Sequence, residues 1–268
     1  MIISHNMNAM NAHRQMKVSN SDQGKSIEKL SSGYRINRAG DDAAGLAISE
    51  KMRAQVNGLD QASRNAQDGI SLVQTTEGAL TETHSILQRL KTLAVQSANG
   101  TYSDGDRALV QKEVTQLKSE ISRIGSQTDF NGNKVLAAAT TLNLQVGDKG
   151  GNTITVSLAA MTDPGTISGV SLSSQTGASN AIATIDSAIK AVSEHRATLG
   201  AVQNRLEHTI KSVDNTSENI QAAESRIRDT DMAKEMMAYT KSNILTQAAQ
   251  SMLAQANQAP QGVLQLLQ

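Results

Sequence analysis

The sequence is most unusual for what it has little of. Among 268 residues there is no cysteine, no tryptophan and a single phenylalanine, and there are only three tyrosines and two prolines. Without cysteine the chain forms no disulfide, no zinc–thiolate site and no thiol nucleophile. The scarcity of aromatic side chains argues against a compact globular core, and the scarcity of proline leaves long stretches free to be helical. We therefore expect an elongated helical bundle.

The sequence also lacks an excess of charge and any long apolar run. Lysine plus arginine and aspartate plus glutamate number 25 each and are interspersed, so no basic patch indicates nucleic-acid binding. No window has the roughly 20 continuous apolar residues of a membrane span, which predicts no membrane insertion. The first residues have neither a basic n-region nor an apolar h-region, so no signal peptide is predicted. If the protein is exported, a dedicated machine is expected to carry it.

What the sequence does contain is two long series of apolar residues spaced seven apart. The first series is Met52, Leu59, Ala66, Val73, Leu80, Leu87 and Ala94, and the second is Ile185, Val192, Leu199, Leu206, Val213, Ile220 and Ile227. A strict seven-residue repeat keeps its apolar seam against a partner when the helices supercoil. Each series covers about 65 Å of helix, and we predict that the two helices pair antiparallel. Small and polar companion residues such as Gly69, Thr76 and Thr83 predict tight or partly wet contacts.

A third helix and a small β region complete the middle of the chain. Val110, Val114, Leu117, Ile121 and Ile124 have coiled-coil spacing, between cap-rich residues 99–106 and a predicted end at Gly125. Residues 142–146 and 154–158 alternate apolar with polar, which predicts a β-hairpin that caps one end of the bundle. The fold class is therefore mainly α, with a small β-hairpin region in the middle of the chain.

The two ends of the chain have weaker periodicity. Residues 5–33 and 231–266 contain spaced methionine, leucine, isoleucine and alanine among many glutamines and asparagines. Such segments bury little surface alone and are marginal as isolated helices. We predict that they are disordered in the monomer and ordered in an assembly.

Neighbouring carboxylates and scattered histidines are the candidates for chemistry. Asp41 and Asp42 point different ways, and Gly33, Gly40 and Gly45 around them favour a bent connector over a metal or acid–base site. Glu194–His195 and Glu207–His208 lack the spacing of a His-Glu-x-x-His motif and are expected on a solvated face. No phosphate loop or nucleophile elbow occurs. The sequence predicts no catalytic, metal or cofactor site.

Charged residues on the helices have two further interpretations. Glu207/Lys211, Glu224/Arg228 and Asp186/Lys190 have the spacing of ion pairs along one helix, worth about 0.2–0.5 kcal/mol each. Arg89, Leu93 and Gln96 lie off the seam, where an exposed leucine beside an arginine suits either a protein-binding spot or an ordinary subunit contact.

Six stretches, taken in order, carry a resemblance to a known family. They are residues 29–53, 64–71 (RNAQDGIS), 75–80 (TTEGAL), 199–206 (LGAVQNRL), 223–229 (AESRIRD) and 263–267 (VLQLL). Through them residues 1–136 and 179–268 resemble the terminal regions of bacterial flagellin. The resemblance implies a non-enzymatic filament subunit that self-assembles into a helical tube for motility. It also implies inner-core helices 1–40 and 231–268, a heptad-helix rod 41–136 and 179–230, and a β region 137–178 in place of large outer domains.

The same resemblance implies partners and sites. The chain is expected to leave the cell largely unfolded through the flagellar type III apparatus, with an export chaperone, and to meet filament cap and junction proteins outside. Gly33, Asp41, Asp42 and Gly45 match a connector that fixes subunit packing. The resemblance implies contacts with host receptors at three places. A Toll-like receptor is expected at Arg89, Leu93, Gln96 and Glu113, and a plant receptor at residues 28–49. Cytosolic sensors are expected at the C-terminal assembly anchor, which consists of Val263, Leu264, Leu266 and Leu267.

Two alternative functions remain at this point. A hook–filament junction protein shares part of the N-terminal pattern and predicts a short cap of few subunits. An enzyme on a helical scaffold requires a cluster of polar side chains.

Overall fold

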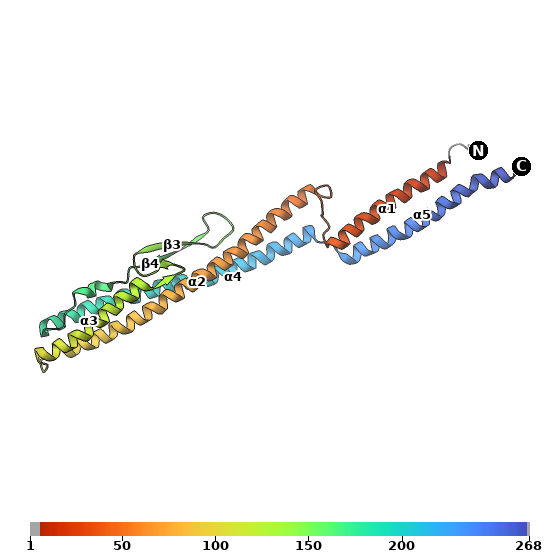
Figure 1. The fold of residues 1–268 in the computed structure, drawn as a ribbon. Helices are drawn as coiled ribbons and strands as arrows, with labels where there is room; N and C mark the ends of the chain where they lie inside the picture. The colour runs from red at the N-terminus through yellow and green to blue at the C-terminus, as the bar shows by residue number, and fades with distance from the viewer. Residues whose placement is uncertain (1–5, 267–268) are drawn as a thin grey trace. The chain divides into compact units, whose positions relative to one another are not determined.

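A computed structural model describes residues 6–266, with side chains as far as residue 258 (Figure 1). The chain forms two compact units. Unit 1 comprises the described residues up to Val56 together with those from Glu218 onward, and unit 2 is Asn57–Ser217. Two long helices, α2 (Ala43–Ala98) and α4 (Gln175–Arg228), contribute to both units.

Within unit 2, α2 and α4 lie side by side and run antiparallel (Figure 1). Polar pairs step along the two helices in opposite directions: Asp60 with Ser217 at 3.0 Å, Glu77 with Arg196 at 3.3 Å and Lys91 with Asp186 at 2.6 Å. The predicted antiparallel pairing is confirmed.

The seven-residue repeats form the seam of this pair. Every member of the first series from Leu59 to Ala94 is buried, as is every member of the second from Ile185 to Val213. The companion positions of α2 are buried too, and they hold Ala62, Gly69, Thr76, Thr83, Leu90 and Ser97. The hydroxyls of Thr76 and Thr83 donate to carbonyls one turn earlier, at 2.8 and 3.0 Å. The burial of these positions fits the predicted tight contacts, and the buried hydroxyls are satisfied within their own helix.

The third helix, α3 (Asp104–Gln127), packs into the same core through Val114 and Ile121. Ser103 and Asp106 form a reciprocal capping box at its start, as the cap-rich residues before it predict. The predicted end at Gly125 is wrong, since the helix continues to Gln127. A Cβ atom at Gly125 would lie 2.7 Å from the backbone of Thr162, so this glycine allows close packing and does not end the helix.

Two small hairpins follow α3. Strands β1 (Asp129–Phe130) and β2 (Asn133–Lys134) are antiparallel and are joined by two residues with positive φ. Strands β3 (Thr140–Gln145) and β4 (Thr153–Leu158) pair antiparallel with Thr140 opposite Leu158, which confirms the predicted hairpin. In β4 the residues alternate between exposed and buried, as a half-covered strand requires.

The β3–β4 hairpin lies along the helices and does not cap their end. The side-chain amide of Asn65 on α2 donates to the carbonyl of Gln145 at 3.0 Å, and Gly69 lies directly under Leu144. The apolar face of the hairpin needs an apolar surface, which the flanks of α2 and α4 offer and a helix end does not. A short 3-10 helix, η1 (Pro164–Gly169), then leads back toward α4.

In unit 1, α1 (Met7–Ser32) and α5 (Met232–Leu266) lie side by side (Figure 1). Asn6 donates to the carbonyl of Ala256 at 2.7 Å, and Thr246 donates to Asn20 at 3.4 Å, so the helices are antiparallel. The buried residues of α1 are Ser19 and Ser26. Among the described residues, no helix is apolar over a length that would cross a membrane.

Candidate assembly surface

Large apolar side chains are exposed along unit 1. They are Met7, Met10, Val18, Ile27, Ile48, Met232, Met236, Met237, Ile244, Leu245 and Met252, with exposed fractions from 45 to 68%. In the described part of unit 2, Val95 and Leu109 are the other two large apolar residues exposed to this degree. Exposed apolar side chains that lie together, as Met236, Met237, Ile244 and Leu245 do on α5, mark a contact with another macromolecule.

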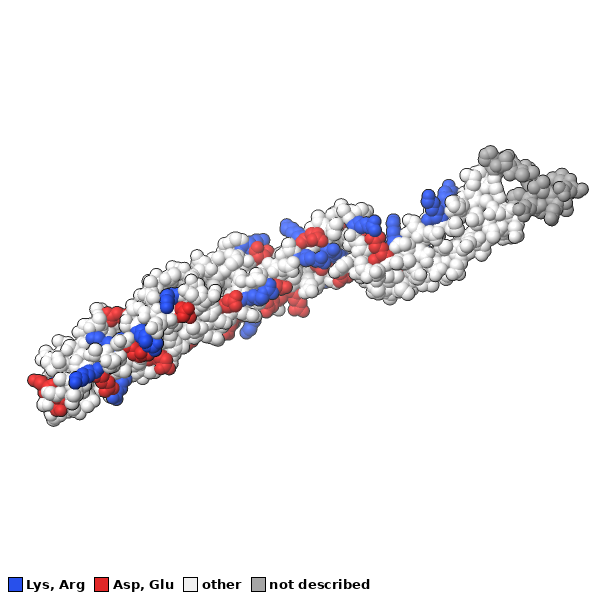
Figure 2. Space-filling view, in the orientation of Figure 1, with Lys and Arg blue, Asp and Glu red and all other residues white. Residues whose placement is uncertain are grey.

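Charge is sparse on α5, whose charged residues are Lys234, Glu235 and Lys241. No charged residue follows Lys241 in the sequence, and the α1–α5 pair is mostly white in Figure 2, whereas both signs of charge are scattered over the α2–α4 region. A groove of about 500 Å³ on α5 is lined by Met236, Met237, Thr240, Lys241, Ile244 and Leu245. This side of α5 can bury apolar side chains of a partner without desolvating more than one charge.

Hydrogen bonds join the segment that connects α1 to α2 and the segment that connects α4 to α5. Gly33 ends α1 in the left-handed conformation, with φ 75°, and its carbonyl accepts from the amide of Thr230 at 3.0 Å. The amide of Arg35 donates to the carbonyl of Arg228 at 2.7 Å. The guanidinium of Arg228 lies over the ring of Tyr34, 4.8 Å from its centre. These contacts hold the two connecting segments together within unit 1.

Asp41, Asp42 and Gly45 stabilise the segment between α1 and α2 and the start of α2. The carboxylate of Asp41 accepts from the backbone amides of Arg38 and Asn37, and these bonds hold the pKa of Asp41 below its ordinary value. Asp42 accepts from the amide of Gly45 at 2.9 Å and so caps the start of α2. A side chain at Gly45 would collide with Asp42 and Ile36. The interpretation of the two carboxylates as parts of a structural turn fits these contacts.

The residues predicted off the α2 seam divide into two groups. Arg89 is exposed and forms an ion pair with Glu113 of α3 at 2.8 Å, and exposed Gln96 donates to the hydroxyl of Tyr102 at 2.9 Å. The expectation of an exposed Leu93 is wrong, because its side chain is 2% exposed and belongs to the core of unit 2. A third seven-residue series on α2 carried the signal for this burial: Leu72, Ala79, Ile86 and Leu93. That flank is covered because the bundle has a third layer.

The two candidate histidines also differ. His208 is exposed as predicted, but the prediction for His195 is wrong, since its side chain is buried at a seam position of α4. Its Nε2 atom accepts from the amide of Ala159 at 3.4 Å, and burial lowers the pKa of His195. Its place in the series Ala181, Ala188, His195 and Val202 was the available signal. His195 is therefore a neutral core residue.

Several residues that were predicted to pair along one helix pair with another helix instead. Glu224 pairs with Arg53 of α2 at 3.3 Å, Arg228 pairs with Glu50 of α2 at 2.8 Å, and Asp186 pairs with Lys91 of α2 at 2.6 Å. Lys190 pairs along its own helix, with Glu194 in place of the predicted Asp186. Antiparallel neighbours bring residues of opposite charge together, so partners on α2 replace the predicted ones for Glu224, Arg228 and Asp186.

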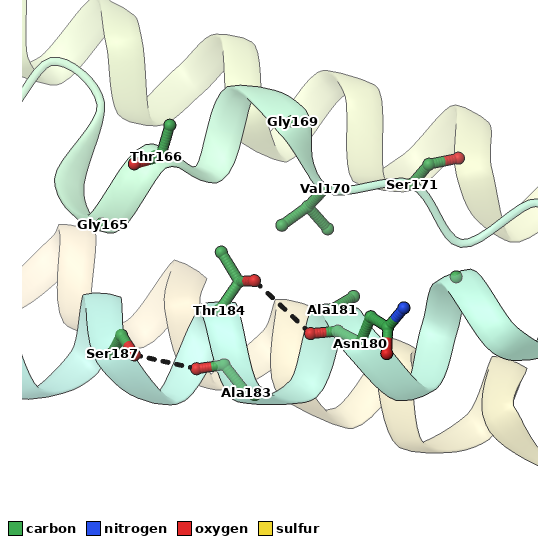
Figure 3. A pocket seen from close by; sticks show the side chains of 11 residues that line it. Gly165, Thr166, Gly169, Val170, Ser171, Asn180, Ala181, Ala183, Thr184 and Ser187 are labelled. Carbon is green, nitrogen blue, oxygen red and sulfur yellow. Dashed lines mark hydrogen bonds between the residues drawn. The ribbon is translucent and has the colours of Figure 1, made fainter.

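Nothing in the described residues resembles a catalytic centre. No group of three or more potential metal ligands occurs among them. A pocket of about 680 Å³ lies between η1 and the start of α4 (Figure 3), and no charged side chain lines it. Two of its hydroxyls, on Thr184 and Ser187, donate to carbonyls of their own helix. The lining therefore includes no carboxylate, histidine or lysine that could activate one of its hydroxyls.

The side chains of the predicted C-terminal anchor lie outside the described part of the chain. Val263, Leu264 and Leu266 belong to the last turns of α5, but their side chains are outside the described part of the chain. Leu267 lies outside the described residues altogether. The spaced methionines of the sequence were the signal for the described apolar surface on α1 and α5.

Comparison with known proteins identifies the family. The family model for the bacterial flagellin N-terminal helical region matches residues 3–141, and the family model for the bacterial flagellin C-terminal helical region matches residues 182–267. Flagellin of Halalkalibacterium halodurans is 60% identical, and flagellin of Bacillus subtilis is 50% identical, each over all of both chains. The crystal structure of Bacillus cereus flagellin matches with a TM-score of 0.50 and 35% identity, over 60% of this chain and 94% of that one.

A flagellar hook-associated protein of Vibrio parahaemolyticus matches with a TM-score of 0.60 over 70% of this chain and all of that one, but with 12% identity. That likeness concerns the fold alone. The terminal matches and the full-length relatives decide the assignment: the chain belongs to the bacterial flagellins, the non-enzymatic subunits of the extracellular flagellar filament.

Proposed function

We propose that the exposed apolar face of α1 and α5 is the main contact between subunits in the filament. The observation that carries this proposal is the run of exposed apolar side chains on α5 together with the absence of charge after Lys241. Met237 and Ile244 are 68 and 60% exposed, and both line the α5 groove. A second copy of the chain presents the same apolar side chains and is the partner that fits them.

The energetics favour folding of the ends together with assembly. Fully burying one methionine, leucine or isoleucine is worth about 1.5–3 kcal/mol. The loss of free translation and rotation on association costs about 4–15 kcal/mol, so several such side chains must be buried together. Helices that bury little within the chain gain most of their stability this way. The predicted disorder of free ends is the monomer state of this mechanism.

In this proposal the segments with exposed apolar side chains and the segments with a complete core have different places in the filament. Residues 1–40 and 231–268 form the inner core of the filament, and residues 41–136 and 179–230 form the surrounding tube with the β region 137–178. The core of unit 2 is complete within one chain, with Leu80, Leu87, Leu199 and Leu206 fully buried. Unit 2 is therefore expected to fold before the subunit is added.

The same apolar face needs covering before assembly. We assign it to an export chaperone in the cell, with delivery through the flagellar export apparatus. Filament cap and junction proteins are expected to contact this face at the two ends of the filament. Because these partners are all assigned to the side chains of the α5 groove, we expect the binding of one to exclude the next.

A host receptor is a second proposed partner, on unit 2. Arg89, Gln96 and Glu113 are exposed together near the turn between α2 and α3, and Val95 and Leu109 are exposed on the same two helices. Leu93 supports this surface from within the core. The segments 28–49 and 263–267 remain proposed contacts of the plant receptor and the cytosolic sensors.

Seeded assembly tests the main proposal. Purified chain is added to short filament fragments and followed by negative-stain electron microscopy, beside a chain lacking residues 1–40 and 231–268. We expect long filaments from the intact chain and none from the truncated one. The double variant Met237→Glu/Ile244→Glu should also fail to extend the seeds, while the conservative Met237→Leu/Ile244→Leu should extend them. Failure of the intact chain to extend the seeds would contradict the proposed contact between subunits.

A further inference from the structure

Methionine is distributed very unevenly between the two units. Nine of the ten methionines lie in residues 1–56 or 218–268. The one methionine of unit 2, Met161, is 5% exposed and belongs to the core. Six methionines of unit 1 are between 49 and 68% exposed: Met7, Met10, Met232, Met236, Met237 and Met252. The apolar face of unit 1 is thus built largely from thioethers.

These thioethers are the most readily oxidised groups that the chain offers. The sequence has no cysteine and no tryptophan to react first. In the reaction a lone pair of the methionine sulfur attacks one oxygen of hydrogen peroxide, an S–O bond forms and the O–O bond breaks. The departing hydroxide takes the remaining proton and leaves as water, so the sulfur is oxidised and the peroxide is reduced.

The product changes the character of the face. A sulfoxide is polar and chiral, whereas the thioether it replaces is apolar and flexible. Met236 and Met237 line the α5 groove beside Ile244 and Leu245, where a polar S–O group has no donor apart from Thr240 and Lys241. Burying such a group against apolar side chains is unfavourable.

We propose that the six exposed methionines are sulfoxidation sites through which peroxide blocks the addition of free subunits to the filament. The inference rests on the proposed function, because it takes the apolar face as the contact between subunits. Free chains present the thioethers, and assembled chains cover them. Oxidation therefore acts on subunits that have not yet been added, and reduction of the sulfoxides reverses it.

The experiment compares untreated and peroxide-treated full-length chain in seeded assembly, with peptide mass spectrometry to locate the sulfoxides. We expect oxidation at the six exposed methionines before Met161, and a rise of about tenfold or more in the concentration needed for growth. Treatment with methionine sulfoxide reductases of both epimer specificities should restore growth. Methionines in preformed filaments should be protected from the same dose of peroxide.

Matched variants separate the face from the rest of the chain. Replacement of the six exposed methionines by leucine conserves volume and should give a chain that assembles after peroxide treatment. The control Met161→Leu should remain as sensitive as the original chain. Unchanged growth of oxidised chain, or no recovery with the reductases, would overturn the inference alone. Failure of the untreated chain to extend seeds would instead overturn the proposed function.

Discussion

The two units of this flagellin use apolar residues in opposite ways. In unit 2 the leucines, isoleucines and valines of three helices and a hairpin are buried against one another within the chain. In unit 1 the helices α1 and α5 leave most of their large apolar side chains exposed. Unit 2 buries its apolar side chains within one chain, whereas unit 1 leaves most of its own in contact with solvent. Under the proposed function, the exposed side chains of unit 1 are those that another copy of the chain would cover.

The largest difference between the two units is expected when one apolar side chain is truncated in each of them. Leu199→Ala removes a fully buried side chain from the α4 seam and should lower the free energy of unfolding by about 2–5 kcal/mol. Met237→Ala removes a side chain that is 68% exposed and should change monomer stability by less than about 0.5 kcal/mol. Urea unfolding followed by circular dichroism measures both. Equal losses would contradict the division into a self-sufficient unit and an assembling one.

The next largest effects on stability are expected from alanine substitutions at two glycines of unit 2. Gly125→Ala places a Cβ atom 2.7 Å from the backbone of Thr162, so the helix or the segment must move, at a cost of about 1–3 kcal/mol. Gly78→Ala meets no atom within 4 Å on an exposed face of α2 and should stabilise by about 0.5–1 kcal/mol. The midpoints of thermal unfolding of the two variants should therefore shift in opposite directions. Stabilisation by both would show that the packing at Gly125 is loose.

His195 gives unit 2 a dependence on pH. Its pKa is lowered in the folded state by burial, so the unfolded chain binds the proton more tightly. The free energy of unfolding should therefore fall as the pH drops below the ordinary histidine pKa of 6.5. Urea titrations at pH 7.5 and 5.5 measure this slope, which should be reduced in His195→Gln. The matched variant of an exposed histidine, His208→Gln, should keep the original slope.

The smallest effect on stability is expected at the Arg89–Glu113 pair. Its side chains are 54 and 43% exposed, so Arg89→Ala should cost no more than about 0.5 kcal/mol. The exchange Arg89→Glu/Glu113→Arg keeps a pair of opposite charges but reverses their positions. It should leave urea unfolding unchanged and abolish signalling by the flagellin-sensing Toll-like receptor in reporter cells. An undiminished response would remove this surface from the proposed function.

Much of the architecture could be predicted from particular residues. The series from Leu59 to Ala94 and from Ile185 to Val213 predicted the buried seam of α2 and α4, and the alternation in residues 154–158 predicted β4. Both patterns are read directly from side-chain spacing, because a helix and a strand repeat with fixed periods. The capping box at Ser103 was similarly local.

The errors all concern what lies beside a helix. Leu93 and His195 were expected in solvent and Gly125 was expected to end α3, yet each is buried by a segment remote in sequence. The ion pairs of Glu224, Arg228 and Asp186 likewise have partners on another helix. The seven-residue series through Leu93 and through His195 indicate that these flanks are apolar, but such a series does not state which remote segment covers a flank.

The sequence by itself therefore determined the periods: which residues share a stripe on each helix, where the strands alternate, and that the last part of the chain carries no charge. A seven-residue repeat defines an angle around the helix axis, and this angle is a property of the chain alone. Only the tertiary structure decided which element lies at each angle. It placed α3 and the hairpin over the flanks of unit 2 and left the methionine face of unit 1 uncovered, because burial depends on contacts between segments distant in sequence.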